Sequence, residues 1–279
     1  MTRFYIDTNV FLDFYQAAKD RLVVFHELAL RAGNIVLTEQ TAREFRRNRA
    51  SRLMDLSEKV EKSAVANIYT TAIVQDMAEF AGWVKARDDA KRQAKVIANK
   101  LKAWAVDEVS DPVYLEFNKL SAAAALLATT AEAIEKAKTR KALGEPPTSP
   151  DKHTIGDELI WETLLAQCKE HLIIVSRDRT FLDNMSLLKA EYEVGGDRRL
   201  LAITESLQEA LALVGQPSEE ISKAEKRLRE EADAELAINT GRCPKCTCEL
   251  DEQGYEGSEG DEAWWLHCPK CGRDFFPPS

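Results

Sequence analysis

Acidic side chains follow apolar runs at several places in this chain. Asp7 comes directly after the apolar residues of RFYIDTNVFLDFY, and Asp178 follows the run LIIVS. Asp157 opens a helical stretch in TIGDELIWETLL, and Glu44 lies one or two helical turns after the strand-like NIVLT. Functional groups of parallel sheets gather outside the carboxyl ends of the strands. These four acids are therefore candidate ligands of a metal ion.

Each of these acids also has an ordinary structural explanation. Asp157 could cap its helix by accepting bonds from free N–H groups, and Asp178 could begin a turn. Glu44 could be a surface residue that pairs with Arg47 or Asn48. Neighbouring acids compete with them: Glu39 could take the place of Glu44, and Asp183 and Glu158 could take the later places.

A second group of candidate ligands lies near the C-terminus, where RCPKCTCEL and LHCPKCGRDF each contain a Cys-Pro-Lys-Cys turn. Two such turns joined by a short hairpin can place four thiolates around one Zn²⁺, and the spacing resembles that of a zinc ribbon. We expect a structural zinc site made of Cys243, Cys246, Cys268 and Cys271. Disulfide pairing is the alternative, and Cys248 or His267 could replace one of the four.

The elements that must position the acids alternate between strand and helix. Strands are predicted at residues 3–7, 34–38, 171–176 and 199–204, and helices at residues 10–19, 22–32, 39–64, 157–169 and 205–214. This alternation predicts an α/β fold with a parallel sheet. Residues from about 60 to 145 are rich in Ala, Lys, Glu and Leu and predict a helical insertion of two or three long helices.

Three regions follow from this pattern: a main α/β domain at residues 1–215, a charged linker helix at residues 216–240 and a zinc ribbon at residues 241–279. The formal net charge of −9 argues against a protein that coats nucleic acid by bulk electrostatics, although it leaves room for a local basic track. The sequence shows no signal peptide and no apolar run of membrane-spanning length. We therefore expect a cytoplasmic protein.

The order and setting of the four acids resemble the PIN-domain family of metal-dependent nucleases. The matching stretches are YIDTNVFLDFY, VLTEQTAREFRRNR, GDELIWETLL and LIIVSRDRTFLDN. The resemblance implies a three-layer sandwich with Asp7, Glu44, Asp157 and Asp178 as catalytic metal ligands. It also implies that Asn9 and Ser176 orient a carboxylate or a water molecule, although the long helical stretch before Asp157 departs from compact members.

Carboxylates in one cleft repel one another unless a cation neutralises them, and all-oxygen ligands suit Mg²⁺ or Mn²⁺. No histidine is needed for such chemistry, and none of His26, His153, His171 and His267 is assigned a catalytic role. The resemblance implies an endoribonuclease of the toxin, defence or RNA-processing type that hydrolyses single-stranded RNA. DNA remains an alternative substrate, and the sequence leaves the oligomeric state open.

Two other functions compete with this one. A phosphatase of the haloacid-dehalogenase type needs a second acid two residues after the first, where this chain has Asn9. A non-catalytic PIN-like RNA-binding adaptor would recruit a partner through its zinc ribbon, and intact acids at all four places count against it.

Basic residues beside Glu44 are candidate phosphate contacts because the planar guanidinium group suits phosphate oxygens. They are Arg43, Arg46, Arg47 and Arg49, with Arg52 close by. A second basic stretch contains Lys85, Arg87, Lys91, Arg92 and Lys95. The zinc ribbon is acidic instead, so a protein partner or docking within the chain is expected there rather than nucleic acid.

Overall fold

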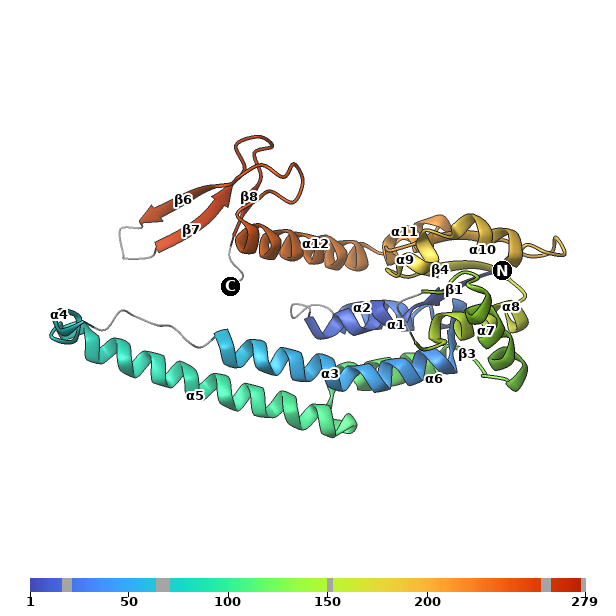
Figure 1. Cartoon of the computed structure of the whole chain (residues 1–279), viewed down its shortest axis with the longest axis horizontal. Coiled ribbons are helices and arrows are strands. Elements are labelled where there is room, and N and C mark those ends of the chain that lie inside the picture. The colour runs from blue at the N-terminus through green and yellow to red at the C-terminus, as the bar shows by residue number, and fades with distance from the viewer. Residues whose placement is uncertain (17–21, 64–70, 150–152, 257–261, 277–279) are drawn as a thin grey trace. The chain divides into compact units, whose positions relative to one another are not determined.

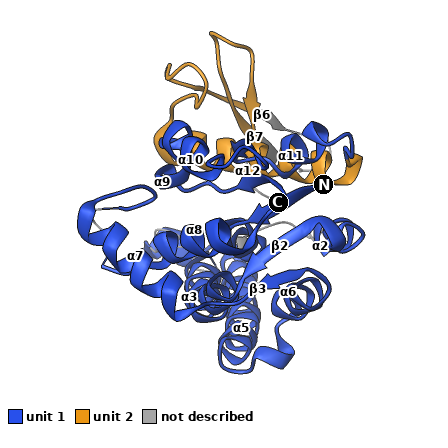
Figure 2. Ribbon diagram, turned by 90° about the vertical axis from the view of Figure 1, so that its right-hand side faces the viewer, with its two compact units in different colours: residues 1–217 blue, residues 218–279 orange. Residues whose placement is uncertain are grey.

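The structure of the chain is a computed structural model that describes residues 1–16, 22–63, 71–149, 153–256 and 262–276. The chain divides into two compact units, Met1–Pro217 and Ser218–Ser279 (Figure 2). Within the described residues, no helix combines the length and the apolar character needed to cross a membrane.

A five-stranded parallel sheet forms the centre of the first unit (Figure 1). The strand order is β3-β2-β1-β4-β5, and every neighbouring pair is parallel. The carboxyl ends of the strands therefore share one edge of the sheet. The strands are β1 (Thr2–Ile6), β2 (Ile35–Thr38), β3 (Ala125–Leu127), β4 (His171–Val175) and β5 (Leu200–Thr204).

Helices connect the strands of this unit. They are α1 (Thr8–Leu12), α2 (Leu22–Ala29), α3 (Glu39–Ser63), α4 (Ala72–Gln75), α5 (Ala78–Val106), α6 (Pro112–Ala123), α7 (Ala131–Leu143), α8 (Gly156–Gln167), α9 (Arg179–Leu182), α10 (Met185–Tyr192) and α11 (Leu207–Leu213). Short 3₁₀ turns lie at η1 (Asp13–Gln16), η3 (Ala32–Asn34) and η4 (Glu108–Ser110).

Alternation along β1 directs side chains into two separate cores, because successive strand residues point to opposite faces. Tyr5 packs in a buried cluster with Trp161 of α8 and Tyr192 of α10. Phe4 and Ile6 face the other way, toward α2 and α11. Helices on both faces give three layers, which confirms the predicted α/β sandwich with a central parallel sheet.

Two predicted elements differ from the structure. The helix expected at residues 10–19 begins at Thr8 and tightens into a 3₁₀ turn at Asp13, and its last residues lie outside the described part of the chain. The helical insertion predicted over residues 60–145 contains α5, α6 and α7, but it also contains an edge strand that was not predicted, β3 at Ala125–Leu127. Alanine and leucine favour helix, but pairing with β2 overrides that preference.

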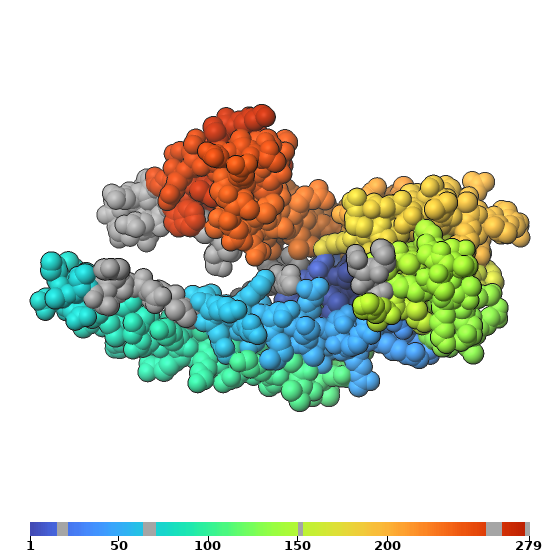
Figure 3. Space-filling model, in the orientation of Figure 1, coloured from blue at the N-terminus to red at the C-terminus, as the bar shows by residue number. Residues whose placement is uncertain are grey.

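The helices α3 and α5 pack side by side as an arm that extends from the sheet (Figures 1 and 3). Leu53 and Ser57 on α3 and Ala94 and Ala98 on α5 are buried along their length. Small residues at such positions allow two helices to approach closely. Because α3 begins at the carboxyl end of β2, the arm starts at the edge of the sheet where the candidate acids lie.

The second unit contains α12 (Glu219–Thr240) and an antiparallel sheet of order β6-β7-β8 (Figure 1). Its strands are β6 (Asp251–Glu256), β7 (Glu262–His267) and β8 (Asp274–Phe275). Ala237 of α12 is buried against Cys243, Cys268 and Phe275. The helix expected to be an exposed linker therefore packs on the cysteine cluster at its C-terminal end.

Candidate functional site

Asp7 stands at the carboxyl end of β1 and caps α1. Its Oδ1 accepts a hydrogen bond from the Thr8 backbone N–H at 2.7 Å. Its Oδ2 accepts two further bonds, from the Ser176 hydroxyl at 2.6 Å and from the Asn9 side-chain amide at 2.9 Å. The residue is only 5% exposed. Asp7 is thus a buried carboxylate held in one orientation.

Ser176 reaches Asp7 because β1 and β4 are neighbouring parallel strands in register from Thr2 to Ile6. The Asp7 backbone N–H donates to the Val175 carbonyl oxygen at 2.9 Å, and this bond fixes the start of the next residue, Ser176. The Ser176 hydroxyl oxygen also accepts the backbone N–H of Asp178 at 3.0 Å. The predicted pair Asn9 and Ser176 therefore lies at Asp7, although the two are far apart in the sequence.

Glu44 projects from the second turn of α3 toward the same place. Its Oε1 accepts the Gln40 side-chain amide at 2.8 Å, and its Oε2 accepts the Thr8 hydroxyl at 3.4 Å. The alternative pairing with Arg47 or Asn48 is not seen; the Asn48 side chain instead accepts from Arg47 at 3.4 Å.

Gly156 at the start of α8 packs directly on the Glu44 carboxylate. A Cβ atom at Gly156 would lie 2.1 Å from Glu44 Oε1, so only glycine fits there without displacing the glutamate. This close approach explains the glycine of the Gly-Asp pair, and it brings the next residue, Asp157, to the site. Asp157 lies in the first turn of α8 but is not its cap, since that position belongs to Ile155.

The three acids interact electrostatically. The pKa of Asp7 is raised from its ordinary 3.8 to about 7, because burial and, to a smaller extent, the charges of Asp157 and Glu44 outweigh the opposing hydrogen bonds from Ser176 and Thr8. Burial also raises the pKa of Tyr5 well above its usual value, with Asp7, Glu44 and Asp157 adding to the effect. Within the described residues, neither Asp7 nor Glu44 has a lysine or arginine partner. This edge of the sheet carries negative charge that is not neutralised by a cationic side chain at Asp7 or Glu44.

A buried set of hydroxyl groups underlies Glu44, and sequence reasoning did not identify it. Thr41 Oγ1 shares hydrogen bonds of 2.9 Å with both Tyr5 and Thr38. The Thr8 hydroxyl lies 3.5 Å from the Thr41 carbonyl oxygen. These contacts fix the first turn of α3, and hence the direction of Glu44, relative to the sheet. In the sequence, Thr38 at the end of β2 and Thr8 just after β1 are the residues that could have indicated this network.

Asp178 takes a different position from the other three. Its Oδ1 caps α9 by accepting both the backbone N–H and the hydroxyl of Thr180 at 2.9 Å. It is connected to Asp7 through its own backbone N–H and Ser176. The turn-forming role weighed from the sequence is therefore present, alongside closeness to the site.

The three competing acids have other contacts. Glu39 pairs with Arg43 at 3.3 Å and accepts the Thr129 backbone N–H at 3.0 Å. Glu158 is buried and binds Thr148 at 2.7 Å, and exposed Asp183 pairs with Arg179 at 3.0 Å.

The arginines of α3 separate into two groups. Arg43, Arg46 and Arg47 are exposed. Arg49 is 1% exposed, and its guanidinium donates to Asp111 at 2.9 Å. Arg49 therefore fixes α3 to the start of α6, and the predicted phosphate contact for this residue is wrong. Its position in a run of arginines gave no sign of burial.

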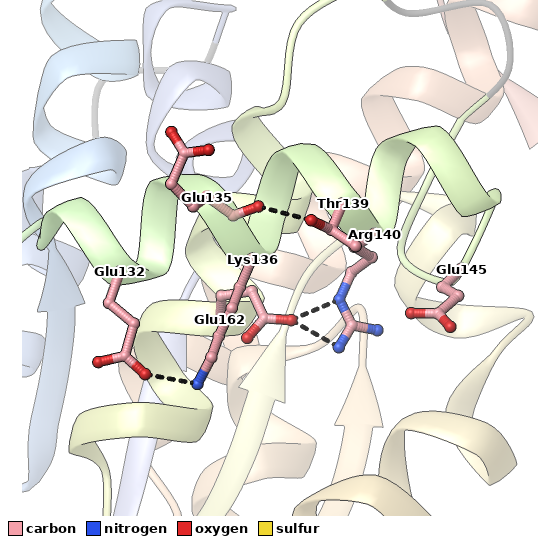
Figure 4. Close-up of a pocket in the computed structure, with 7 residues that line it drawn as sticks. All are labelled: Glu132, Glu135, Lys136, Thr139, Arg140, Glu145 and Glu162. Carbon is pink, nitrogen blue, oxygen red and sulfur yellow. Dashed lines mark hydrogen bonds and ion pairs between the residues drawn. The ribbon is translucent and has the colours of Figure 1, made fainter.

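A shallow groove on α7 is lined by charged residues but is built differently (Figure 4). Arg140 is buried and donates to Glu162 at 2.8 Å, to the Pro146 carbonyl oxygen at 2.7 Å and to Glu191. Lys136 pairs with Glu132 at 2.8 Å. Arg140 connects α7 to α8, to α10 and to the loop at Pro146, so we assign the groove a structural role.

The four cysteines predicted from the sequence meet in the second unit. Among the described residues, Cys243, Cys246, Cys268 and Cys271 are the group of His, Cys, Asp or Glu side chains that could hold a metal ion, with all four sulfur atoms within 4.8 Å of one another. Described cysteines form no disulfide. A tetrahedral thiolate set of this kind fits structural Zn²⁺. The carboxylates near Asp7 are close enough to interact but do not form so compact a group.

Comparison with known proteins gives one result. A family model described as PIN domain matches residues 4–181, which is more than half of the chain and contains Asp7, Glu44, Asp157 and Asp178. No curated protein and no solved structure matches. PIN domains are generally metal-dependent nucleases, which agrees with buried acids at the carboxyl edge of a parallel sheet. The chain therefore belongs to the PIN-domain family.

Proposed function

We propose that this protein is a divalent-metal-dependent endoribonuclease that hydrolyses single-stranded RNA, leaving 5′-phosphate and 3′-hydroxyl ends. The observation that carries the proposal is the meeting of Asp7, Glu44 and Asp157, whose charges are close enough that the last two raise the pKa of the first. Family membership supports nuclease chemistry. The choice of RNA, and a role in defence, toxicity or RNA processing, rests on resemblance.

Mg²⁺ or Mn²⁺ fits the residues present. The donors are carboxylate oxygens, which hard cations prefer. The hydrogen bonds that Asp7 and Glu44 accept from the described residues all come from neutral groups. A bound cation would favour the ionised form of Asp7, whose pKa is raised first by burial and then by the charges of Asp157 and Glu44. When bound, such an ion supplies Lewis acidity toward a water molecule and the scissile phosphate.

The residues near Asp7 have two proposed roles, as metal ligands and as positioning residues. Asp7, Glu44 and Asp157 are the proposed ligands, with Asp178 as the fourth. Ser176 and Asn9 are positioning residues, because both donate to Asp7 Oδ2 and so determine where its other lone pairs point. Gln40 and Thr8 do the same for the two oxygens of Glu44.

Phosphate contacts beside the acids come from Arg43, Arg46 and Arg47. Arg46 pairs with Glu108 at 2.7 Å, and Arg43 pairs with Glu39 at 3.3 Å. Exposed ion pairs of this kind add little stability, so an RNA phosphate can replace the carboxylate. These three arginines form the proposed rim of the RNA-binding path beside the acids.

The arm extends this rim. Its helices α3 and α5 contain 14 Lys and Arg against 8 Asp and Glu, whereas the whole chain has 38 against 47. On α5, Lys85, Lys91 and Lys95 are exposed and have no ion-pair partner among the described residues. A basic surface that starts at the acids would hold the RNA backbone outside the cleavage site.

The second unit suits a protein partner rather than RNA. It contains 15 Asp and Glu against 8 Lys and Arg. Trp264 is 43% exposed and Phe276 is 58% exposed. Exposed aromatic rings in an acidic setting suit a protein partner better than a nucleic acid. We propose that Zn²⁺ is structural here and that this face recruits a protein.

The decisive experiment is cleavage of labelled RNA and DNA with Mg²⁺, with Mn²⁺ or with EDTA, with zinc content measured in parallel. We expect metal-dependent RNA cleavage that Asp7→Asn abolishes. Asp183→Asn is the matched control, because Asp183 is exposed and its ion pair within the described part of the chain is with nearby Arg179. Equal cleavage by Asp7→Asn and wild type would overturn the proposal. RNA binding without cleavage under every metal condition would support the adaptor alternative instead.

A further inference from the structure

Cys248 lies beside the zinc ligands but belongs to neither Cys-Pro-Lys-Cys turn. In the first turn, the Thr247 N–H donates to the Cys243 carbonyl oxygen at 2.8 Å. The Cys243 N–H in turn donates to the Cys248 carbonyl oxygen at 2.9 Å. Cys248 therefore closes this turn through its backbone, which leaves its thiol for another use.

The second turn repeats the same backbone pattern. The Gly272 N–H donates to the Cys268 carbonyl oxygen, and the Cys268 N–H donates to the Arg273 carbonyl oxygen, both at 2.8 Å. Arg273 is thus the structural equivalent of Cys248, and its side chain pairs with Asp233 at 3.1 Å. The two turns match in geometry, but only the first one carries an additional thiol.

That thiol already lies at ligand spacing from Cys246 and Cys268, although it does not lie within 4.8 Å of every one of the four ligand sulfur atoms. Cys248 Sγ lies 3.2 Å from Cys268 Sγ and 3.3 Å from Cys246 Sγ, and Cys246 Sγ lies 3.4 Å from Cys268 Sγ. Sulfur atoms at the corners of a zinc tetrahedron are about 3.8 Å apart, given Zn–S bonds of about 2.3 Å. Cys246 and Cys248 thus approach Cys268 equally closely.

We infer that Cys248 is a reserve zinc ligand that exchanges with Cys246. In the exchange, the Zn–S bond to Cys246 breaks and a bond to Cys248 forms. The proton that Cys248 gives up goes to the sulfur of Cys246, so four thiolates remain on the metal and the charge is unchanged. Both thiols are half-buried, whereas Cys243 and Cys268 are buried and keep their places. The inference concerns the second unit alone and holds whether or not the first unit is a nuclease.

The structure offers a matched control, because Cys271 is the equivalent of Cys246 in the turn that has no additional thiol. Zinc affinity and the Co²⁺ absorption spectrum would be measured on the full chain for wild type, Cys246→Ser, Cys271→Ser, Cys248→Ser and the double variant Cys246→Ser/Cys248→Ser. We expect Cys246→Ser to keep a four-thiolate Co²⁺ spectrum and zinc affinity close to wild type. Cys271→Ser and the double variant should weaken zinc binding by more than the about 100-fold that loss of an outer hydrogen-bond partner can cost.

A second measurement needs no variant. Brief alkylation of the zinc-loaded wild type, followed by peptide mass spectrometry, reports which thiol is off the metal. Exchange predicts label on Cys246 in some molecules and on Cys248 in others. Label on Cys248 alone, or equal loss of zinc affinity in Cys246→Ser and Cys271→Ser, would overturn the inference. So would a Cys248→Ser variant that loses zinc as Cys271→Ser does, because Cys248 would then be a permanent ligand.

Discussion

Replacing Asp7 with asparagine should stabilise the magnesium-free protein while removing its activity. Asp7 is buried beside two other acids, and its pKa is raised from 3.8 to about 7. An acid whose pKa is higher in the folded state favours folding below the unfolded-state pKa. That contribution is lost as the pH rises through the folded-state pKa. The ionised Asp7 therefore destabilises the fold above about pH 7.

The size of the effect follows from the same two values. A tenfold change in an acid constant corresponds to about 1.4 kcal/mol, so holding Asp7 ionised costs about 4 kcal/mol in the free energy of unfolding. Asparagine removes the charge, but its amide faces the Asn9 amide, which donates to Asp7 at 2.9 Å. That conflict costs about 1–2 kcal/mol. Asp7→Asn should therefore gain about 2–3 kcal/mol at pH 8 and show no gain at pH 4.

The assay is urea unfolding of wild type and Asp7→Asn at pH 4, 6 and 8, in buffer without Mg²⁺ or Mn²⁺ and without chelator, so that zinc stays bound. The stability difference should grow between pH 4 and pH 7 and then level off. Added Mg²⁺ should stabilise wild type only, because a ligand stabilises the state that binds it. A variant that is less stable than wild type at pH 8, or a difference independent of pH, would refute the reasoning.

Three further changes test other parts of the structure. Gly156→Ala should displace Glu44, whose Oε1 would lie 2.1 Å from the new Cβ, and should weaken Mn²⁺ binding measured by calorimetry; unchanged binding would contradict the proposed role of Glu44. Arg49→Ala should cost about 3–5 kcal/mol in urea unfolding because it leaves a buried aspartate unpaired, whereas Arg47→Ala on the exposed face should cost little, and equal losses would show that Arg49 is not a structural residue. Thr247→Gly should stabilise the zinc unit by about 0.5–1 kcal/mol in thermal unfolding, because Thr247 has φ 57° and glycine adopts that conformation without strain; a lower melting temperature would refute this.

The sequence allowed parts of the site to be predicted where a functional residue directly follows an apolar strand. The run before Asp7 and the run before Ser176 are uninterrupted and apolar, so both strands and their common edge could be predicted. Their pairing brings the two residues within 2.6 Å. The cysteine turns were predictable from spacing, because the local sequence itself forms each half of the site.

Other features depend on contacts that no local pattern reports. Residues 125–127 form an edge strand only because β2 is beside them. Arg49 looks like its exposed neighbours, yet its place on α3 turns it toward Asp111. The close approach of Gly156 to Glu44 joins two helices that are separated by more than 100 residues in the sequence. Tertiary packing decides each of these, so sequence periodicity could not.

Anomalous diffraction from crystals of the full chain grown with Mn²⁺ tests the central claim most directly. We predict a manganese peak bounded by the carboxylates of Asp7, Glu44 and Asp157, and no such peak in crystals of Asp7→Asn. Strong manganese peaks elsewhere, with none among these three side chains, would contradict the proposal that they hold the catalytic cation.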